Sequence, residues 1–442
     1  MCLIALPFLI YDFSVLSFPG FENFTKVFIV QKTKRKQMVQ ANPSQLGGET
    51  AASASKYSRY VWWGMVLGGL YFFGPGVSIF QYGAYMVLFF LGMLYYQQDG
   101  MLYACNAPSI PKRPSQNPPT LRTPAERGME YRSLHIKTSD GCRLHGWLMT
   151  VPLRSKSSPT IVYFHGNAGN LGLRLPLYEE FYFKLGCNIV AFDYRGYGDS
   201  TGKPNEVGLQ LDAKAVLKYV HNDLNEYIDS SQIILFGRSL GGSVATWLAG
   251  QKYEGESTGK CDLKQQPHGI RGLVIENTFA SIGDLAMKLF GLLKIFQFLF
   301  PWLLKSKWLA KEDIKAVPVP IMLLSAQLDL LVPPAHMNML FKNASDNELT
   351  RIHRFFKGGH NDTPIKEPIK YAKAFQQYLR DLDLVTTPVP KPSSGSRSEK
   401  DAAAAAKRAS DALLNASILN ATKNVPTTTQ RTKKNEELKK ID

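Results

Sequence analysis

Cysteine is scarce in this sequence, and what there is forms no recognisable pattern. The five cysteines among 442 residues are odd in number, and no two of them form a Cys-x-x-Cys pair. This argues against a disulfide framework and against a structural zinc site. We therefore expect buried free thiols, no bound metal and no cofactor. The cysteines are Cys2, Cys105, Cys142, Cys187 and Cys261.

The sequence also lacks the features of a nucleic-acid-binding protein, although its formal net charge is +16. Residues 1–59 hold 7 Lys and Arg against 3 Asp and Glu, and residues 386–442 hold 11 against 6. The stretch between these flanks has no basic stripe interleaved with aromatics, no helix-turn-helix and no zinc spacing. Basic flanks beside an apolar segment are typical of contacts with anionic lipid or of topology signals. We exclude nucleic acid as a partner and expect membrane lipid.

One long stretch of the sequence lacks charge altogether. The 39 residues between Arg59 and Asp99 include no Asp, Glu, Lys or Arg. Residues 77–96 alone form a run of about the 20 residues that an α-helix needs to cross the hydrocarbon core. Aromatic residues such as Trp62 and Tyr96 stand where interfacial side chains are expected. A core helix of this length without one charge is uncommon, so we predict membrane insertion.

This segment sets the predicted organisation of the N-terminal part of the chain. We expect a disordered basic segment at 1–60, a transmembrane segment at 61–97 and a linker at 98–131. The chain has two candidate start codons, Met1 and Met38. The apolar residues at its beginning make a poor signal peptide, because no positively charged region precedes them.

Two topologies fit the transmembrane segment, since Gly74-Pro75-Gly76 divides it. A single kinked span places the two ends of the chain on opposite sides of the membrane, whereas a hairpin places both in the cytosol. The first arm of a hairpin, 61–73, is short for a full crossing, so we expect a single-pass protein of the endoplasmic reticulum or another endomembrane. Lys439-Lys440 has the form of a cytosolic dilysine retrieval signal, which leaves the side of the membrane open. Glycosylation sequons at Asn343, Asn415 and Asn420 would instead favour the non-cytosolic side of the membrane for these residues.

Residues 132–384 read as one domain of continuous globular sequence. Short β-rich runs alternate with helical stretches, which is typical of βαβ units and a mostly parallel sheet with helices on both faces. We expect a cap at about 281–308 and a low-complexity basic tail at 385–442. A hairpin is predicted across 139–141 and an amphipathic helix at 205–221. Strands are predicted at 134–137, 143–151, 160–165, 188–193, 232–236, 272–276, 321–325 and 351–356.

A five-residue turn, Gly237-Arg238-Ser239-Leu240-Gly241, lies between a predicted strand and a predicted helix. A Gly-x-Ser-x-Gly run alone is a modest signal, but this context is the one required of a nucleophile elbow. Its glycines let the serine occupy a strained turn that lifts the hydroxyl above the sheet. The alternative is a structural Gly-Ser turn, which the strand-turn-helix context disfavours. We predict Ser239 as a nucleophile.

A nucleophilic serine needs a base and an acid, which such sheets supply in the order Ser, acid, His. His360 follows the last predicted strand on a loop that contains Gly358 and Gly359. Asp329 lies just past the strand before it. There it would hold the tautomer of the imidazole and stabilise its cation. We predict Ser239, Asp329 and His360 as the catalytic residues.

An oxyanion hole requires two backbone N–H groups near the nucleophile. One is predicted at Leu240, directly after the serine. The other belongs to the loop His165-Gly166-Asn167, and we assign it to Asn167. His165 is interpreted as a residue that fixes this loop, because Ser239 already has His360 as its base.

Several of these runs together resemble the alpha/beta-hydrolase domain-containing protein 13 family. The resemblance covers about residues 85–382. It implies a single-pass anchored serine hydrolase of the α/β-hydrolase fold, with Ser239, Asp329 and His360 as its triad. The insertion at 251–268 and the tail after Thr386 depart from the family pattern. The runs are Phe164–Asn170, Asp193–Gly198, Phe236–Gly242, Glu276–Phe279 and Gly359–Thr363.

The predicted cap contains a stretch, 289–304, that is apolar nearly all round, unlike an ordinary surface helix. An exposed apolar surface suits an acyl chain or a membrane surface. Our first hypothesis is hydrolysis of an acyl ester or thioester with a lipid chain, such as a lysophospholipid, a monoglyceride or an S-acylated protein. The competing hypothesis is a membrane scaffold that keeps the fold with little catalysis. An intact Ser/Asp/His set argues against the scaffold.

Overall fold

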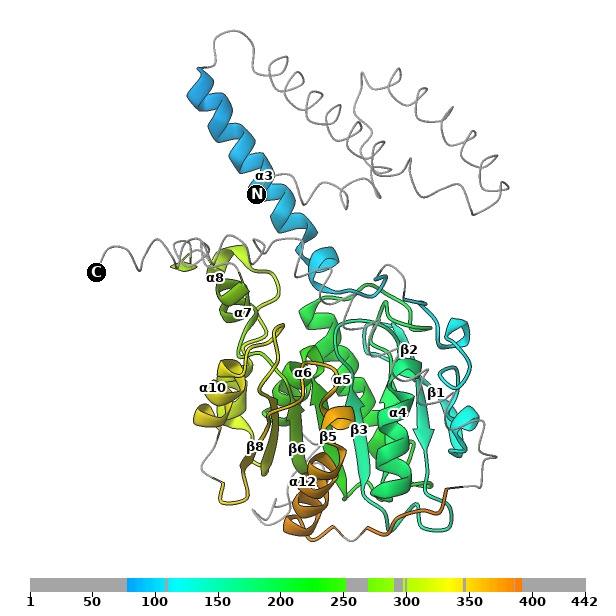
Figure 1. Ribbon diagram of the computed structural model, residues 1–442. Helices are drawn as coiled ribbons and strands as arrows, with labels where there is room; N and C mark the ends of the chain where they lie inside the picture. The colour runs from blue at the N-terminus through cyan, green and yellow to red at the C-terminus, as the bar shows by residue number, and fades with distance from the viewer. Residues whose placement is uncertain are drawn as a thin grey trace, which may run out of the picture. The chain divides into compact units, whose positions relative to one another are not determined.

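The computed structural model describes residues 78–107, 110–251, 269–289, 297–298, 300–344, 347–384 and 386–391 (Figure 1). The chain divides into two compact units, Met1–Met93 and Leu94–Asp442. The basic segment predicted at 1–60 lies outside the described residues. So do residues 61–77 of the predicted transmembrane segment, most of the 251–268 insertion and nearly all of the predicted tail.

Helix α3, Ile79–Leu102, contains the described part of the predicted transmembrane segment. Many of its side chains are exposed, including Phe80, Leu88 and Tyr96. Within the part of the chain that the structure describes, none of the helices combines the length and the apolarity that a bilayer crossing requires.

The second unit is built on one sheet of eight strands, in the order β1-β2-β4-β3-β5-β6-β7-β8. Strand β2 runs antiparallel to both β1 and β4, whereas every pair from β4 to β8 is parallel. The predicted mostly parallel sheet and its opening hairpin are therefore confirmed. The strands are β1 Tyr131–Lys137, β2 Arg143–Met149, β3 Thr160–Phe164, β4 Asn188–Phe192, β5 Ile233–Arg238, β6 Ile270–Glu276, β7 Ile321–Ala326 and β8 Arg351–Phe355.

The helices of this unit alternate with the strands along the chain. The α-helices after α3 are α4 Leu175–Glu179, α5 Glu206–Asn222, α6 Leu240–Ala249, α7 Ile282–Leu289, α8 Phe300–Leu303, α9 Ala310–Asp313, α10 Ala335–Asn343, α11 Thr363–Lys366 and α12 Pro368–Asp381. Short 3-10 turns cover Pro114–Gln116, Pro124–Arg127, Leu171–Arg174 and Ile314–Ala316, and a π-helical turn covers Glu180–Lys184.

The apolar side chains of the sheet form one core on each of its faces. In β5, Ile233 and Leu235 belong to one core, and Ile234 and Phe236 belong to the other. This follows from the two-residue period of a strand, which sends successive side chains to opposite faces. Helices α5, α6 and α10 contribute to the first core, and α4 and α12 to the second (Figure 1). The helices on both faces explain why strands β3 to β7 are buried along almost their whole length.

Individual elements follow the sequence prediction with small shifts. Helix α5 begins one residue after its predicted start, because the Asn205 side chain accepts a hydrogen bond from the N–H of Gly208 at 2.7 Å and caps the helix. The helical stretch between β3 and β4 consists of a 3-10 turn, one short α-helix and a π-helical turn.

The chain before β1 packs against the domain. Tyr103 is 2% exposed, and Leu121 and Met129 are also buried. The side-chain amides of Asn117 and Asn170 pair reciprocally, at 2.8 and 3.0 Å. The packed structure therefore extends upstream of residue 132 into the stretch expected to be a linker.

Candidate active site

Ser239 stands alone between the end of β5 and the start of α6. Its backbone has φ 54° and ψ −119°, which is a sparsely populated conformation for a residue with a side chain. Its N–H donates to the carbonyl of Glu276 on the neighbouring strand at 2.8 Å. The side chain is thereby held at the carboxyl edge of the sheet, which is where ligands bind in open α/β sheets.

The glycines around Ser239 are required by close backbone contacts. A Cβ on Gly237 would lie 2.3 Å from the carbonyl oxygen of Gly241, and one on Gly241 would lie 2.0 Å from that of Phe164. A Cβ on Gly242 would lie 1.8 Å from Thr278 Oγ1. The turn can form only because three of its positions lack side chains.

The three predicted catalytic residues form one hydrogen-bonded chain. His360 Nε2 lies 3.1 Å from Ser239 Oγ, and His360 Nδ1 lies 2.6 Å from Asp329 Oδ2. The three side chains come from the loops after β5, β7 and β8, and each residue is at most 9% exposed. With Nδ1–H donating to the carboxylate, Nε2 is left as the acceptor for the serine hydroxyl.

The carboxylate of Asp329 is held from both sides. Its Oδ1 accepts hydrogen bonds from the N–H groups of Leu331 and Val332, at 2.9 and 2.8 Å. Its Oδ2 faces His360. Because each oxygen has its own partners, the carboxylate has a defined orientation toward the imidazole.

The loop that bears His360 is fixed by two residues that sequence reasoning did not select. Arg238 Nη2 donates to the carbonyl of His360 at 2.7 Å, and Asn277 Nδ2 donates to the same oxygen at 3.1 Å. Asn277 has φ 49° and accepts from the N–H of Ala326 at 2.8 Å. Its presence in the Glu276–Phe279 run was a signal of importance, but the run did not indicate the role.

Glu276 lies under this loop and is fully buried. It accepts a hydrogen bond from the Tyr371 hydroxyl at 3.1 Å. Burial raises the pKa of its carboxyl, while the nearby Arg238 guanidinium acts in the opposite direction. Arg238 directly precedes Ser239, and the Ser239 N–H donates to the Glu276 carbonyl, so both buried residues adjoin the nucleophile turn.

The loop that follows β3 lies beside Ser239, as the oxyanion-hole prediction requires. A Cβ on Gly166 would lie 3.6 Å from Ser239 Cβ. Leu240 is the first residue of α6, so its N–H belongs to the group of helix-terminal donors that have no partner within the helix. The assignment of the Leu240 and Asn167 N–H groups to the hole stays a prediction.

His165 is completely buried at the base of the same loop. Its Nδ1 lies 2.7 Å from the Gly166 carbonyl, and the N–H of Tyr194 approaches its Nε2 at 3.5 Å. These contacts assign Nδ1 as the donor and agree with the interpretation of His165 as a residue that fixes the loop. Burial, together with the Arg174 guanidinium, lowers the pKa of His165 to about 3. The ring is therefore neutral at physiological pH.

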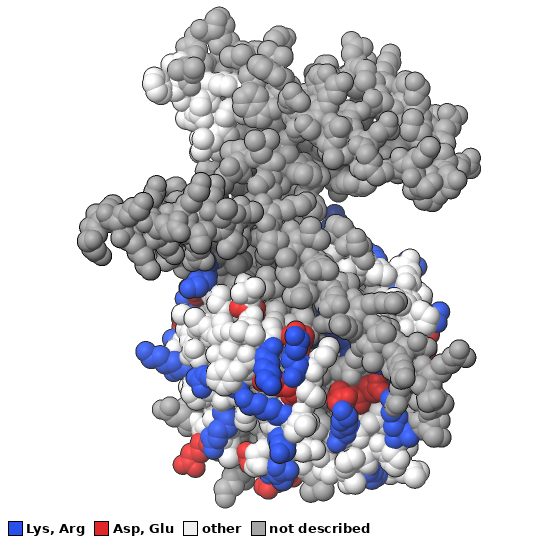
Figure 2. All heavy atoms as spheres, in the orientation of Figure 1, with Lys and Arg blue, Asp and Glu red and all other residues white. Residues whose placement is uncertain are grey.

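Three of the cysteines lie in the described part of the chain, and all three are free thiols. Cys142 and Cys187 are buried and Cys105 is partly buried, as predicted. Searched over the same part of the chain, the side chains of His, Cys, Asp and Glu form no group of three or more that is arranged to hold a metal ion. On the face shown in Figure 2, Lys and Arg side chains are spread among Asp and Glu.

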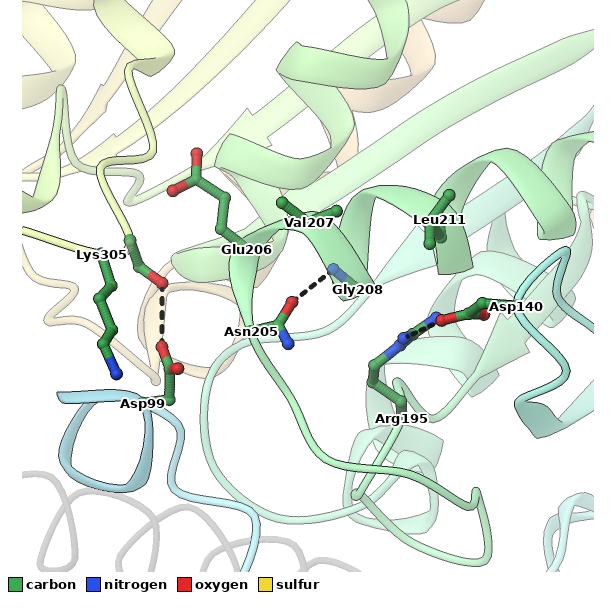
Figure 3. Close-up of a pocket in the computed structure, with 10 residues that line it drawn as sticks. Asp99, Asp140, Arg195, Asn205, Glu206, Val207, Gly208, Leu211 and Lys305 are labelled. Carbon is green, nitrogen blue, oxygen red and sulfur yellow. Dashed lines mark hydrogen bonds and ion pairs between the residues drawn. The ribbon is translucent and has the colours of Figure 1, made fainter. Parts of the chain in front are cut away.

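A cavity of about 370 Å³ lies near the first turn of α5 (Figure 3). Its lining includes Asp99, Arg195, Glu206 and Lys305, and none of the three predicted catalytic residues. Arg195 is engaged there by the carboxylate of Asp140 at 2.7 Å. Because Ser239, Asp329 and His360 all lie outside its lining, we do not assign the reacting groups to this cavity.

The strand order, the strand-turn-helix at Ser239 and the positions of Asp329 and His360 are those of the α/β hydrolases. The family described as alpha/beta hydrolase fold matches residues 159–296. Protein bem46 of Schizosaccharomyces pombe is 32% identical over 304 residues, which cover 68% of this chain and 92% of that protein. The chain therefore belongs to the family of alpha/beta hydrolase domain proteins, as its resemblance indicated.

Two further relatives belong to the same family. The alpha/beta hydrolase domain-containing protein WAV2 of Arabidopsis thaliana is 35% identical over 266 residues, covering 58% of this chain and 81% of that protein. A Saccharomyces cerevisiae relative, named as an uncharacterized membrane protein, is 33% identical over 245 residues, covering 55% of this chain and 78% of that protein.

The buried His165 predicts a pH dependence of stability. Its pKa of about 3 in the folded chain lies below the ordinary value of 6.5, so between these values the unfolded chain binds more protons at this site. Stability from His165 is present above pH 6.5 and is lost as the pH falls toward 3, by about 1.4 kcal/mol per pH unit. The difference in free energy of unfolding between wild type and His165→Gln should therefore shrink from pH 7 to pH 5, measured by urea denaturation. A constant difference over this range would show that the ring takes up its proton equally in the folded and the unfolded chain, so that its pKa is not lowered by folding.

Proposed function

We propose that this protein is a membrane-anchored serine hydrolase that cleaves carboxylic ester or thioester bonds of lipid-like acyl substrates. The observation that carries the proposal is the chain from Ser239 Oγ through His360 to Asp329, with separations of 3.1 and 2.6 Å. Its members are buried, oriented and in the order that nucleophilic acyl transfer requires. The α/β-hydrolase fold is consistent with this chemistry, although fold alone does not determine an activity.

In the first half of the reaction, Ser239 Oγ attacks the carbonyl carbon of the substrate while His360 Nε2 accepts the hydroxyl proton. The carboxylate of Asp329 stabilises the imidazolium that forms. Collapse of the tetrahedral intermediate breaks the bond to the leaving alcohol or thiol, which takes the proton from His360. The product of this step is an acyl ester on Ser239.

The tetrahedral intermediate carries a negative oxygen that needs preorganised donors. We assign these to the N–H groups of Leu240 and Asn167. The Leu240 N–H stands at the start of α6, where the helix dipole favours negative charge. Removing one such donor from an oxyanion hole costs a factor of about 10² to 10³ in kcat.

Water completes the cycle by the same route. His360 Nε2 accepts a proton from the water as it attacks the acyl carbonyl, and then returns it to Ser239 Oγ as the acid departs. No atom beyond the substrate, water and these side chains is required for the balance of this reaction.

Apolar side chains next to the triad support an acyl substrate. Leu328 and Leu330 flank Asp329 and are 59% and 87% exposed. In the predicted cap, Phe298 and Trp302 are 63% and 73% exposed. Large apolar side chains left in water beside a catalytic site are typical of a surface that binds an apolar partner.

Membrane anchoring is supported by the 39 residues without charge between Arg59 and Asp99, of which 60–77 lie outside the described residues. It is also supported by the S. cerevisiae relative, which is named as a membrane protein. An anchor would hold the hydrolase domain close to substrates that partition into lipid.

A fluorophosphonate probe tests the nucleophile. It should label the wild-type chain and fail to label Ser239→Ala, because the probe reacts with an activated serine. The matched control is Ser243→Ala, since Ser243 is fully buried one turn further along α6. Labelling of Ser239→Ala would reject the triad, and loss of labelling in Ser243→Ala would point to a folding defect.

The contact between Asn277 and the His360 carbonyl predicts a loss of turnover. Asn277→Asp keeps the acceptor but replaces the donor with a second carboxylate oxygen, which repels that carbonyl and displaces the base. We expect kcat for a butanoyl ester to fall about tenfold with little change in KM. Asn188→Asp is the control, because Asn188 is an equally buried amide at the other end of the sheet. An equal loss of kcat in both variants would contradict a specific role for Asn277.

The apolar rim predicts a preference for long acyl chains. Leu330→Ser should lower the ratio of kcat/KM for a dodecanoyl ester to that for a butanoyl ester by about fivefold, the equivalent of about 1 kcal/mol of lost apolar contact. Leu153→Ser is the control, because Leu153 is fully exposed on the loop before β3, at the opposite edge of the sheet. An unchanged ratio in Leu330→Ser would remove this residue from the acyl-binding surface.

A further inference from the structure

The last turn of α3 and the two residues after it are bound to the hydrolase domain at two places. We call these residues, Gln98–Ala104, the docking turn. They follow the predicted transmembrane segment directly and belong to the same compact unit as the sheet. One of the two contacts is with the loop assigned to the oxyanion hole, and the other is with the segment that leads out of the cap.

The side chain of Asn167 makes the first contact. Its Nδ2 donates to the carbonyl of Leu102 at 2.5 Å, and its Oδ1 accepts from the N–H of Ala104 at 3.1 Å. The same Oδ1 accepts from the hydroxyl of Tyr197 at 2.7 Å, and Tyr197 is completely buried. The Asn167 amide is therefore hydrogen-bonded to the main chain on both sides of Tyr103.

Tyr103 makes the second contact, and it fixes the main chain to which the Asn167 amide is hydrogen-bonded. Its ring is 2% exposed. Its hydroxyl lies 3.0 Å from Ser306 Oγ and accepts from the indole N–H of Trp308 at 3.0 Å. Trp308 is fully buried and has φ 41°, and its backbone N–H donates a further hydrogen bond to Glu206 Oε1 at 3.1 Å.

Further contacts join the docking turn to the segment before Trp308. Gln98 donates through Nε2 to the carbonyl of Leu303 at 2.6 Å and accepts from the N–H of Lys305 at 3.0 Å. Ser306 Oγ donates to Asp99 Oδ1 at 3.4 Å. Figure 3 shows Asp99 and Lys305 on neighbouring segments beside the first turn of α5. The docking turn is thus bound through side chains and main chain alike.

A second asparagine of the same loop repeats the arrangement. Asn170 Nδ2 donates to the carbonyl of Pro111 at 3.0 Å and pairs with the amide of Asn117. Both ends of the loop Asn167–Asn170 are therefore held by chain that precedes the first strand of the sheet. A backbone N–H cannot turn independently of the main chain. The direction of the Asn167 N–H therefore depends on how this loop is held.

We infer that the docking turn positions the oxyanion hole, with the Asn167 side chain as the positioning group through which it acts. The segment that enters the domain from the predicted membrane anchor is then a working part of the active site. This inference rests on the proposed serine-hydrolase function. A donor misplaced by about 1 Å can cost a factor of about 10² in rate, so undocking reduces turnover even when the triad is intact.

The simplest competing explanation is that these contacts only stabilise the fold. A double-mutant cycle in the full-length chain separates the two, with Tyr103→Phe, Asn167→Ala and the double variant. The readouts are kcat and KM for a butanoyl ester, the inhibition constant of phenylboronic acid and the melting temperature. The boronic acid mimics the tetrahedral intermediate, so its affinity reports the oxyanion hole.

Asn167→Ala keeps the backbone N–H but releases the loop that aims it, so we expect it to lower kcat about a hundredfold and Tyr103→Phe about tenfold, with KM nearly unchanged. The inhibition constant of the boronic acid should rise in parallel. In the Asn167→Ala background, Tyr103→Phe should have less than about a twofold further effect, because the residue it acts through is gone.

Tyr378→Phe is the matched control. Tyr378 is 3% exposed, and its hydroxyl donates to the carbonyls of Pro320 and Leu273 at 2.7 and 3.2 Å. Leu273 lies in the middle of β6 and Pro320 directly precedes β7. Both contacts are therefore away from the edge of the sheet that bears Ser239. Tyr378→Phe should lower the melting temperature by about as much as Tyr103→Phe and leave kcat unchanged.

Two outcomes would overturn the inference while the proposed function stands. In one, Tyr103→Phe leaves kcat unchanged. In the other, the effects of Tyr103→Phe and Asn167→Ala on kcat multiply in the double variant. A wild-type chain that neither hydrolyses the ester nor reacts with a fluorophosphonate would instead reject the proposed function itself.

Discussion

The structure depends on one strained turn that joins β5 to α6. Ser239 has a positive φ, and the turn is possible only because Gly237, Gly241 and Gly242 let the β3 loop and Thr278 approach the backbone. Strain of this kind costs of the order of 1–3 kcal/mol and persists only where surrounding packing requires it. Here the packing comes from a sheet covered by helices on both faces. The fold supplies the stability, and the turn uses part of it to present one hydroxyl.

The loops around this turn are held mainly by buried or half-buried amides and an imidazole, joined in the His360 loop by the Arg238 guanidinium. Asn277 holds the His360 loop, Asn167 and Asn170 hold the loop after β3, and His165 fixes the base of that loop. A neutral buried polar group has a fixed hydrogen-bond geometry and a lower desolvation cost than a charge. Such groups are suited to setting the positions of N–H donors and of a base to within fractions of an ångström.

Much of the sheet and the candidate site could be predicted from the sequence, because both depend on local patterns. The strands of the parallel part are short apolar runs, and Ser239, Asp329 and His360 each follow such a run. Asn277 could not be assigned in the same way, since its positive φ and its bond to the His360 carbonyl arise from tertiary contacts between three strands. The docking of Tyr103 was also hidden, because an aromatic residue at the end of an apolar segment looks the same whether it faces lipid or protein.

The two oxygens of Asp329 have a chemical consequence of their own. Oδ1 accepts two backbone N–H groups, so only an acceptor fits there. An asparagine in its place would have to keep its carbonyl oxygen at Oδ1 and turn its NH₂ toward His360 Nδ1. His360 Nδ1 would then have to accept a hydrogen bond, so the proton of the ring would lie on Nε2. The Ser239 hydroxyl would face a donor instead of an acceptor. Through its backbone contacts, this loop therefore distinguishes a carboxylate from an amide of the same shape and selects the imidazole tautomer that can act as a base.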